Sequence, residues 1–259
     1  MINSKKEYFR RIVKQLALEY NAKPENFTEE GLALTVPAKP EGVRLYSHDV
    51  PFFAMATTGN SVVITADARL HERLRQLACE ANDLHRLYEF HNLRKVDDML
   101  REYGYAVKGT VHMYLPGKPF EEVQMPKGFT YRWFETEDEI AAAFYPNEQF
   151  TMALSENYNE DRPDVIALAA MDNGKMVGVA GVSADAVDMW QVGIDVLPAY
   201  RGRGLGTALV KALCRRIEER GRLPFYGTAV ANIHSQVIAE HCGFYPAWTE
   251  TVTAKSEQK

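Results

Sequence analysis

The sequence has few cysteines and no long apolar run. Its three cysteines, Cys79, Cys214 and Cys242, are widely separated and lack the spacing of a metal site, so we expect reduced thiols and no bound metal. The N-terminus lacks the apolar stretch of a signal peptide, and no uninterrupted apolar segment reaches the length that spans a bilayer. These features predict a cytoplasmic protein without membrane contact.

An excess of positive charge is also missing. The 259 residues include 30 Lys and Arg against 35 Asp and Glu, a formal net charge of −5. Such a chain has no general electrostatic attraction for nucleic acid. The 46% hydrophobic and 25% charged residues are ordinary for a soluble globular protein of one large or two smaller domains. The oligomeric state stays open, with a homodimer among the alternatives.

A glycine-rich segment, Arg201-Gly-Arg-Gly-Leu-Gly206, joins a predicted strand to a predicted helix. Residues 190–196 alternate as in a strand, whereas Leu205, Leu209 and Leu213 recur at helical spacing. A helix N-terminus leaves backbone N–H groups unpaired and carries partial positive charge, and glycines let a ligand approach the backbone. The segment therefore predicts a site for a phosphorylated group.

The spacing distinguishes between phosphate-binding motifs. A Walker loop needs Lys and then Ser or Thr after its last glycine, whereas Gly206 is followed by Thr207 and Ala208. In the dinucleotide fingerprint G-x-G-x-x-G, Gly202 and Gly204 fit, but the third glycine comes one residue early. Both motifs are therefore excluded.

The pattern that fits is R-x-x-G-x-G after a strand, and it resembles the acetyl-coenzyme A pyrophosphate loop of the GNAT (GCN5-related N-acetyltransferase) superfamily. A second segment agrees with this resemblance, because the superfamily reads roughly N-x-x-A-x-x-L-Y-x-x-x-G-F there. We expect the first residue to cap a helix and the glycine to end it. The residues in register are Asn232, Ser235, Ile238, Gly243 and Phe244.

The resemblance covers about residues 127–255 and implies an α/β (mixed α+β) fold. Its central sheet would be mixed but mostly antiparallel, with helices on its faces. We expect a hairpin turn at Asn173-Gly174 and a helical piece at residues 147–157. The expected domains are a smaller N-terminal α/β domain at 1–117, a Pro- and Gly-containing linker at 118–128, and a GNAT domain at 129–259.

The N-terminal half carries no motif that identifies it. In this half a predicted helix is followed by Tyr103-Gly-Tyr105 and then by a predicted strand. The same order occurs near the C-terminus, where a predicted helix is followed by Cys242-Gly-Phe244 and a strand. One hypothesis is a degenerate GNAT-like half that has lost its phosphate loop; an unrelated α/β domain is the alternative. Periodicity predicts helices at 3–20, 67–79 and 93–103, and strands at 32–36, 52–57, 61–66 and 107–115.

The resemblance also implies a co-substrate, acetyl-coenzyme A, and its binding residues. The strand before the loop would contact the pantetheine arm, the loop would bind the pyrophosphate, and the later helix would lie beside both. The implied residues are Ile194, Asp195 and Val196 on the strand, Arg201, Gly202, Arg203, Gly204, Leu205, Gly206 and Thr207 in the loop, and Asn232 and Ser235 on the helix.

Ala239 departs from the superfamily pattern, because many members carry a Tyr there that protonates the departing thiolate. An alkyl ammonium acceptor must also lose a proton before it attacks, so a base is needed. Tyr226 is our first substitute for the acid and Asp188 a candidate base; a structural Tyr and a turn Asp are the alternatives. A strand N–H within 191–193 could stabilise the oxyanion.

Three functions remain open. The first is N-acetylation of a primary amine of a small molecule, such as an antibiotic, amino acid or polyamine, by direct attack in a ternary complex. The second is acetylation of a protein N-terminus or lysine side chain. The third is a sensor that binds acetyl-coenzyme A without turnover, an alternative that Ala239 keeps open. No motif indicates the acceptor pocket.

Overall fold

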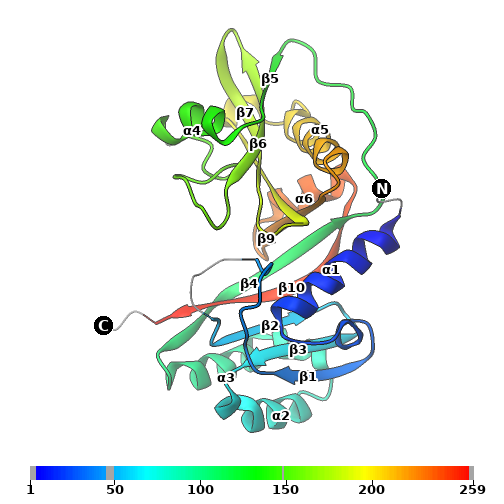
Figure 1. The fold of residues 1–259 in the computed structure, drawn as a ribbon, viewed down its shortest axis with the longest axis vertical. Helices are drawn as coiled ribbons and strands as arrows, with labels where there is room; N and C mark the ends of the chain where they lie inside the picture. The colour runs from blue at the N-terminus through cyan, green and yellow to red at the C-terminus, as the bar shows by residue number, and fades with distance from the viewer. Residues whose placement is uncertain (1–3, 45–49, 148, 257–259) are drawn as a thin grey trace. The chain divides into compact units, whose positions relative to one another are not determined.

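The computed structural model describes residues 4–44, 50–147 and 149–256 (Figure 1). The chain divides into two units that do not follow chain order. The C-terminal unit comprises Met1–Tyr8, Tyr114–Gly227 and Asn232–Tyr245. The N-terminal unit comprises Phe9–Met113, Thr228–Ala231 and Pro246–Lys259. The expected linker at 118–128 has no helix or strand and belongs to the C-terminal unit.

The C-terminal unit contains an antiparallel meander that ends in one parallel pair. Asn173 (φ 47°) and Gly174 (φ 83°) form the tight turn between its second and third strands, because both central positions need a left-handed backbone. The strands, in sheet order, are β9 (Leu223–Ala229), β8 (Met189–Val196), β7 (Lys175–Ser183), β6 (Asp164–Asp172) and β5 (Thr130–Phe134), with only β8 and β9 parallel.

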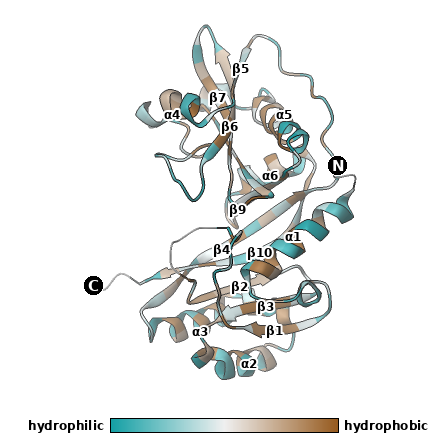
Figure 2. Ribbon diagram, in the orientation of Figure 1, coloured by the Kyte–Doolittle hydropathy of each residue, from teal (hydrophilic) through white to brown (hydrophobic). Residues whose placement is uncertain are grey.

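Helices cover both faces of this sheet (Figure 1). On one face, which we call the α5 face, Val192 and Val196 pack with Leu209 of α5. On the other, the α4 face, Ala167 and Val179 pack with helix α4. The helices have a hydrophobic side and a hydrophilic side, as such packing requires (Figure 2). Their bounds are α4 (Glu137–Phe144), α5 (Leu205–Glu219) and α6 (Ile233–Cys242).

The helical piece expected at residues 147–157 was a wrong prediction. A short 3-10 helix covers Tyr145–Asn147, residue 148 lies outside the described residues, and 149–157 form turns. Phe150 has a left-handed backbone (φ 65°), which ends any helix there. Its carbonyl accepts from the N–H groups of Ala153 and Leu154 at 2.8 and 3.1 Å, so the segment folds back in a single turn.

The N-terminal unit has its own strands and core. The order is β1-β3-β2-β10-β4, with β1 parallel to β3 and β2 antiparallel to β3. This order does not repeat the meander of the other unit, so it lends no support to a second GNAT-like half. The elements are α1 (Lys5–Glu19), β1 (Gly31–Thr35), β2 (Phe53–Thr57), β3 (Ser61–Ala66), α2 (His71–Glu80), α3 (Phe90–Arg101), β4 (Tyr105–Pro116) and β10 (Phe244–Lys255), with short 3-10 helices at Pro24–Phe27, Ala68–Leu70 and Leu84–Tyr88.

A buried guanidinium joins two carboxylates inside the N-terminal unit. Arg44 Nη2 lies 2.6 Å from Glu19 Oε2 and 2.5 Å from Glu250 Oε1, and the Arg44 side chain is only 1% exposed. Trp248 Nε1 donates to the same oxygen of Glu250 at 2.9 Å. One arginine in this chain thus binds two carboxylates at once.

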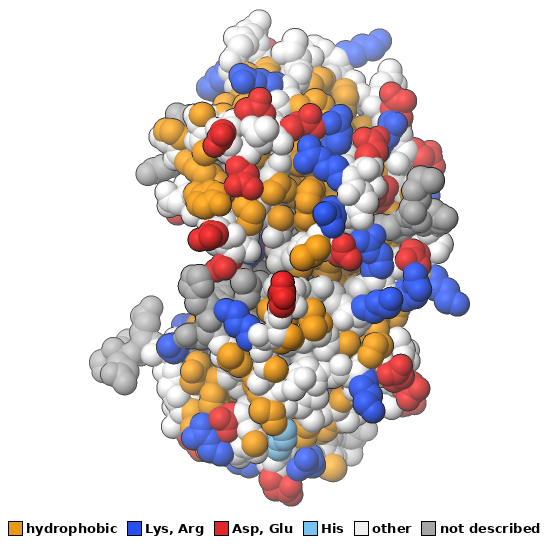
Figure 3. All heavy atoms as spheres, viewed as in Figure 1, with side chains coloured by type: hydrophobic (Ala, Val, Ile, Leu, Met, Phe, Trp, Pro, Cys, Tyr) orange, Lys and Arg blue, Asp and Glu red, His pale blue; other side chains and the backbone are white. Residues whose placement is uncertain are grey.

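The fold class expected from the sequence, a mixed α/β protein with a mostly antiparallel sheet flanked by helices, is confirmed. On the face drawn in Figure 3, basic and acidic side chains are intermixed. Among the described residues, none of the helices is both long and apolar enough to cross a membrane.

Candidate functional site

Strand β8 is paired with β7 from Gln191 to Val196 and with β9 only from Met189 to Val192. The β7–β8 ladder runs to the pair Gly178 and Val196. The parallel β8–β9 ladder begins at Met189 and ends at the pair Val192 and Tyr226. Residues Gly193–Val196, which we call the open edge of β8, therefore have no ladder partner in β9. Alternate residues of a strand direct their backbone groups to the same side, and the N–H of Leu197 donates to the carbonyl of Val177 in β7. The backbone groups of Gly193 and Asp195 therefore also face β7, whereas those of Ile194 and Val196 face the side on which a ligand could lie along the strand.

The segment Arg201–Thr207, the glycine loop, follows this open edge. Gly202 (φ 74°) and Gly204 (φ 77°) have left-handed backbones that other residues adopt only at a cost. The first helical hydrogen bond of α5 runs from Ala208 N–H to the carbonyl of Gly204, at 3.1 Å. Within the described chain, the six amides from Gly202 to Thr207 donate to no protein acceptor.

The charge around these amides favours an anion. The helix dipole places partial positive charge at the start of α5, and the first turn holds no acidic residue. Arg201 and Arg203 are exposed; Arg201 Nε donates to the carbonyl of Val196 at 2.8 Å, and the guanidinium of Arg203 lies 5.2 Å from the ring centre of Tyr200. Six amides and two arginine side chains thus belong to one short segment, a combination that suits a phosphate group.

Gly206 shows that the loop and the open edge are adjacent. A Cβ on Gly206 would lie 3.7 Å from Ile194 Cγ1 and 3.8 Å from both Val196 Cγ2 and Ile238 Cδ1. The first turn of α5 therefore lies against the end of β8 and against α6. Three segments that the sequence analysis singled out separately meet at this point.

Helix α6 begins and ends as its sequence predicts. Asn232 Oδ1 accepts from the N–H of Ser235 at 3.2 Å, and Gly243 (φ 92°) ends the helix with a left-handed backbone. The Cys242 thiol donates to the carbonyl of Thr207 at 3.6 Å, and burial raises its pKa to about 12. This thiol therefore joins α6 to the glycine loop and stays protonated at neutral pH.

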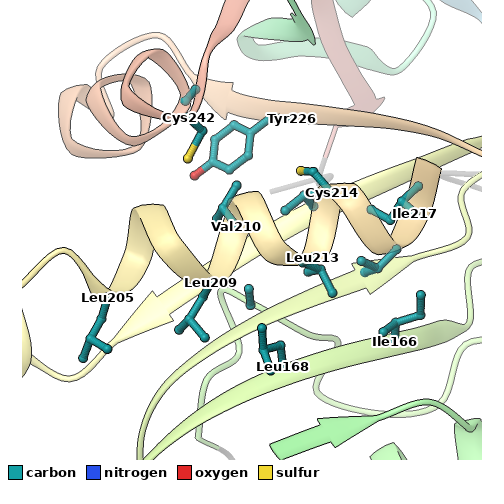
Figure 4. Close-up of a cluster of buried hydrophobic side chains, with 14 of the residues drawn as sticks. Ile166, Leu168, Leu205, Leu209, Val210, Leu213, Cys214, Ile217, Tyr226 and Cys242 are labelled. Atoms are coloured by element: carbon teal, nitrogen blue, oxygen red, sulfur yellow. The ribbon is translucent and has the colours of Figure 1, made fainter. Parts of the chain in front are cut away.

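Tyr226 is buried between α5 and α6, with 3% of its surface exposed. Figure 4 shows its ring on the side of α5 that faces away from Ile166 and Leu168. Burial raises the pKa of Tyr226, and a hydrogen bond with the Ser235 side chain opposes that rise. Ala239 is fully buried in the same apolar cluster.

Asp188 lies away from Tyr226, just before the first residue of β8. Its side chain is 62% exposed and lies 3.2 Å from Arg222 Nη1, while its carbonyl accepts from the N–H of Leu223 at 2.8 Å. It precedes Val192 by four residues, or about 13 Å along a strand. The structure thus does not bring the two predicted catalytic side chains together.

Two glycines on the α4 face let a loop lie directly on the sheet, a feature that the sequence analysis missed. Gly181 and Gly193 are paired across β7 and β8. A Cβ on Gly193 would lie 2.7 Å from the carbonyl oxygens of Met152 and Ala153, and one on Gly181 would lie 2.3 Å from Leu154 Cδ2. Glycines inside apolar strands were the available signal, since they often mark close backbone approach.

Asp164 holds both ends of this loop. It is 2% exposed, accepts from the N–H of Ser155 at 2.9 Å, and accepts from the Tyr145 hydroxyl at 3.2 Å. Burial raises the pKa of Asp164, and these hydrogen bonds offset part of the rise. Tyr145 and Ser155 are therefore fixed to one carboxyl group, and residues 152–154 between them lie against Gly181 and Gly193, where the open edge of β8 begins.

Residues 129–244 match the model of the acetyltransferase (GNAT) family. This segment is a GNAT acetyltransferase domain. The resemblance inferred from the glycine loop and the Asn232 helix is thereby confirmed for the C-terminal half. No protein with a curated function matches the sequence.

The chain is similar to several solved structures, one of which, with a TM-score of 0.51, supports the fold. A GCN5-related N-acetyltransferase-like protein from Streptococcus suis aligns over 95% of this chain and 98% of its own, at 16% identity and a TM-score of 0.51. A GCN5-related N-acetyltransferase from Kribbella flavida aligns over 62% of this chain and 63% of its own, at 19% identity and a TM-score of 0.44. A GNAT acetyltransferase from Colwellia psychrerythraea aligns over 57% and 55%, at 16% identity and a TM-score of 0.41. This chain thus spans less than two thirds of the latter two.

One further cavity of the GNAT domain, of about 290 Å³, lies away from the glycine loop. It is bounded by the segment 122–125, by Tyr131 and Trp133 of β5, and by the C-terminal half of α5. Arg216 stacks over Trp133 there at 4.7 Å and pairs with Glu135. Since the glycine loop is at the opposite end of α5, this cavity is separate from the candidate cofactor site.

Proposed function

We propose that this protein transfers an acetyl group from acetyl-coenzyme A to the primary amine of a small molecule, by direct attack in a ternary complex. The observation that carries the proposal is the run of six unpaired amides from Gly202 to Thr207 beside the open edge of β8. GNAT acetyltransferases generally use acetyl-coenzyme A, and this chain has a GNAT domain at 129–244.

The loop and the open edge divide the recognition of the co-substrate between them. The amides of Gly202–Thr207, with Arg201 and Arg203, would bind the pyrophosphate. The backbone groups of Ile194 and Val196 would pair with the amides of the pantetheine arm, and Asp195 between them would lie beside that arm. Asn232 and Ser235 would border the same site from α6. Because these groups are held by strand and helix backbone, they need little rearrangement on binding.

The reaction needs a base for the amine, donors for the oxyanion and an acid for the thiolate. The amine nitrogen bonds to the carbonyl carbon, the carbon–sulfur bond breaks, and the sulfur takes a proton. Tyr226 is our candidate acid: its raised pKa keeps the hydroxyl protonated, and Ser235 connects it to the surface of α6. A backbone N–H of residues 191–193 would stabilise the oxyanion. Asp188 remains the candidate base, acting through water.

A sensor that binds acetyl-coenzyme A without turnover is the second candidate. Ala239 favours it, because no hydroxyl is available at the position where many superfamily members carry their proton donor. The sensor and the enzyme share the cofactor site and differ only in the chemistry that follows binding.

Two measurements separate these functions. Isothermal titration with acetyl-coenzyme A tests the cofactor site, and absence of binding would refute both candidates. Thiol release with a panel of primary amines, followed by mass spectrometry of the acetylated product, then tests transfer. Amine-dependent release supports the enzyme. Binding without release from any amine of the panel supports the sensor.

A further inference from the structure

Two rows of side chains cross the α4 face of the sheet at the start of the open edge. Directly paired residues of adjacent antiparallel strands point to the same face. Asp164, Ser183 and Gln191 form one such row, and Ala167, Gly181 and Gly193 form the next. The two rows are two residues apart along β8, or about 7 Å. The first row is polar, whereas the second is small and covered by the segment 150–154.

A guanidinium is anchored on the polar row. Arg162 Nη2 lies 3.1 Å from Asp185 Oδ2 and donates to Gln191 Oε1 at 3.2 Å. The Ser183 hydroxyl donates to the other oxygen of Asp185 at 2.6 Å. Arg162, in the loop before β6, is therefore held by Asp185 after β7 and by Gln191 of β8, and Ser183 of β7 in turn holds Asp185.

The burial of this group is uneven. The side chain of Asp185 is 0% exposed, whereas that of Arg162 is 25% exposed. A fully buried carboxylate has a large desolvation cost, and an ion pair with good geometry offsets that cost but seldom adds net stability. A buried pair does fix the orientation of its partner. Asp185 and Gln191 hold Arg162 from the protein side and leave part of the guanidinium open to solvent.

The donors around this opening suit an oxygen anion. A guanidinium carries five N–H donors in a planar array that matches a carboxylate. Gln191 Oε1 faces Arg162, so the amide Nε2 of Gln191, which carries two N–H donors, is turned away from the guanidinium. Arg44 in the N-terminal unit shows that an arginine of this chain can bind two carboxylates at once.

We infer that Arg162, positioned by Asp185 and assisted by Gln191, binds the carboxylate of the acetyl acceptor, so that the acceptor is a small amine that also carries a carboxylate, such as an amino acid. This inference rests on the proposed acetyl transfer. Gln191 precedes Gly193 by two residues, about 7 Å along β8, so the guanidinium that Gln191 contacts lies near the start of the open edge. A polyamine, with no carboxylate, would gain nothing from Arg162.

The test compares acceptors that differ only in the carboxylate. Standard amino acids, their carboxamides and the corresponding amines without the carboxylate are assayed for thiol release. In parallel, each is titrated into the complex of the protein with coenzyme A. We expect both kcat/KM and affinity to be at least about tenfold higher for an amino acid than for its carboxamide. This is the effect of losing one hydrogen bond to a charged group. Equal or better performance of the neutral or decarboxylated amines, or no amino acid binding, would overturn the inference.

Variants of Arg162 give a second readout. Arg162→Gln should lower kcat/KM for the amino acid at least about tenfold, mainly through KM, and abolish its preference over the carboxamide. Affinity for acetyl-coenzyme A should not change. The double variant R162Q/D185N removes both charges and so guards against misfolding caused by an unpaired Asp185. A tenfold loss with an unchanged preference would show a structural role and contradict the inference.

The results also separate this inference from the proposed function. Thiol release that depends on amines but ignores the carboxylate would leave the acetyltransferase standing and remove the assignment of Arg162. Carboxylate-selective binding without any thiol release would keep the assignment and remove the transfer reaction. The titrations thus test whether amino acid binding depends on Arg162 even if the protein transfers no acetyl group.

Discussion

Val192 of β8 and Tyr226 of β9 form the last pair of the parallel ladder in the GNAT domain. This pair marks the point where β8 acquires its open edge, and the buried side chain of Tyr226 lies between α5 and α6. The hydroxyl is hydrogen bonded to Ser235, three residues into a helix that borders the glycine loop. We therefore propose this hydroxyl as the proton source in place of the side chain at position 239, which is Ala.

Tyr226→Phe tests whether this hydroxyl protonates the leaving thiolate. We expect kcat to fall about 100-fold or more, the usual contribution of an acid catalyst, with unchanged affinity for acetyl-coenzyme A. Phe fills the same volume, so the free energy of unfolding should fall by only about 1 kcal/mol for the lost hydrogen bond. Steady-state kinetics and urea unfolding measure both quantities.

The base role of Asp188 is tested in the same assay. Asp188→Asn should lower kcat/KM most strongly at low pH if the carboxylate removes the ammonium proton through water. Arg222→Gln is its control, because it removes the ion pair and leaves the carboxylate. Equal rates for Asp188→Asn and the parent protein across the pH profile would show that Asp188 is not the base. In the preceding experiment, an unchanged kcat in Tyr226→Phe would show that Tyr226 is not the acid.

Two glycines at the ends of α5 give a matched test of the phosphate site. Gly204 (φ 77°) and Gly221 (φ 75°) have the same left-handed backbone, so alanine at either should cost about 1–2 kcal/mol of stability. Only Gly204 belongs to the glycine loop. We expect Gly204→Ala to weaken acetyl-coenzyme A binding about tenfold or more and Gly221→Ala to leave it unchanged, by isothermal titration. Equal losses of acetyl-coenzyme A affinity in Gly204→Ala and Gly221→Ala would indicate that backbone strain alone causes them.

Gly193→Ala should disturb the contact between the sheet and the segment 150–154. Its Cβ would lie 2.7 Å from two carbonyl oxygens, closer than van der Waals contact permits, so the segment must move. We expect a loss of about 1–3 kcal/mol in the free energy of unfolding. Gly206→Ala is the control for stability, because its Cβ would meet its nearest atom at 3.7 Å. Similar unfolding midpoints for Gly193→Ala and Gly206→Ala would show that the segment 150–154 moves away from residue 193 at little cost in stability.

Glu218 of α5 should make stability depend on pH. Burial raises its pKa above 4.5, although the Tyr8 hydroxyl and the N–H of Phe120 both donate to it. A carboxyl whose pKa is raised in the folded state contributes stability below its unfolded pKa and loses that contribution as the pH rises through the folded pKa. The stability of the parent protein relative to Glu218→Gln should therefore fall as the pH rises from about 4.5.

Urea unfolding at a series of pH values measures this difference. Glu219→Gln, an exposed neighbour on the same helix, controls for the loss of one charge. A parent protein that gains stability relative to Glu218→Gln with rising pH would contradict the expected sign.

Local backbone chemistry explains which parts of the fold could be predicted. Asn173-Gly174 needs two left-handed residues, Asn232 caps a helix and Gly243 ends one, and all three positions behave as their residue types require. The glycine loop was recognisable for the same reason, since its glycines and its helix start are adjacent in sequence. The roles of these residues in cofactor binding remain predictions.

The acceptor side could not be predicted, because its parts are distant in sequence. Arg162, Asp185 and Gln191 carry no motif, and only the pairing of β6, β7 and β8 brings them together. The left-handed backbone of Phe150 likewise had no local cue, and it replaced an expected helix with a turn that lies on Gly193.

The sequence alone determined the strand, glycine loop and helix of the candidate cofactor site, because hydrogen bonding and backbone preference act over a few residues. Tertiary structure decided what surrounds that site. It buried Tyr226 opposite Val192, placed Asp188 at the other end of the ladder, and anchored Arg162 on a buried carboxylate. Strand register and burial set these positions, and both depend on packing between segments that the sequence separates.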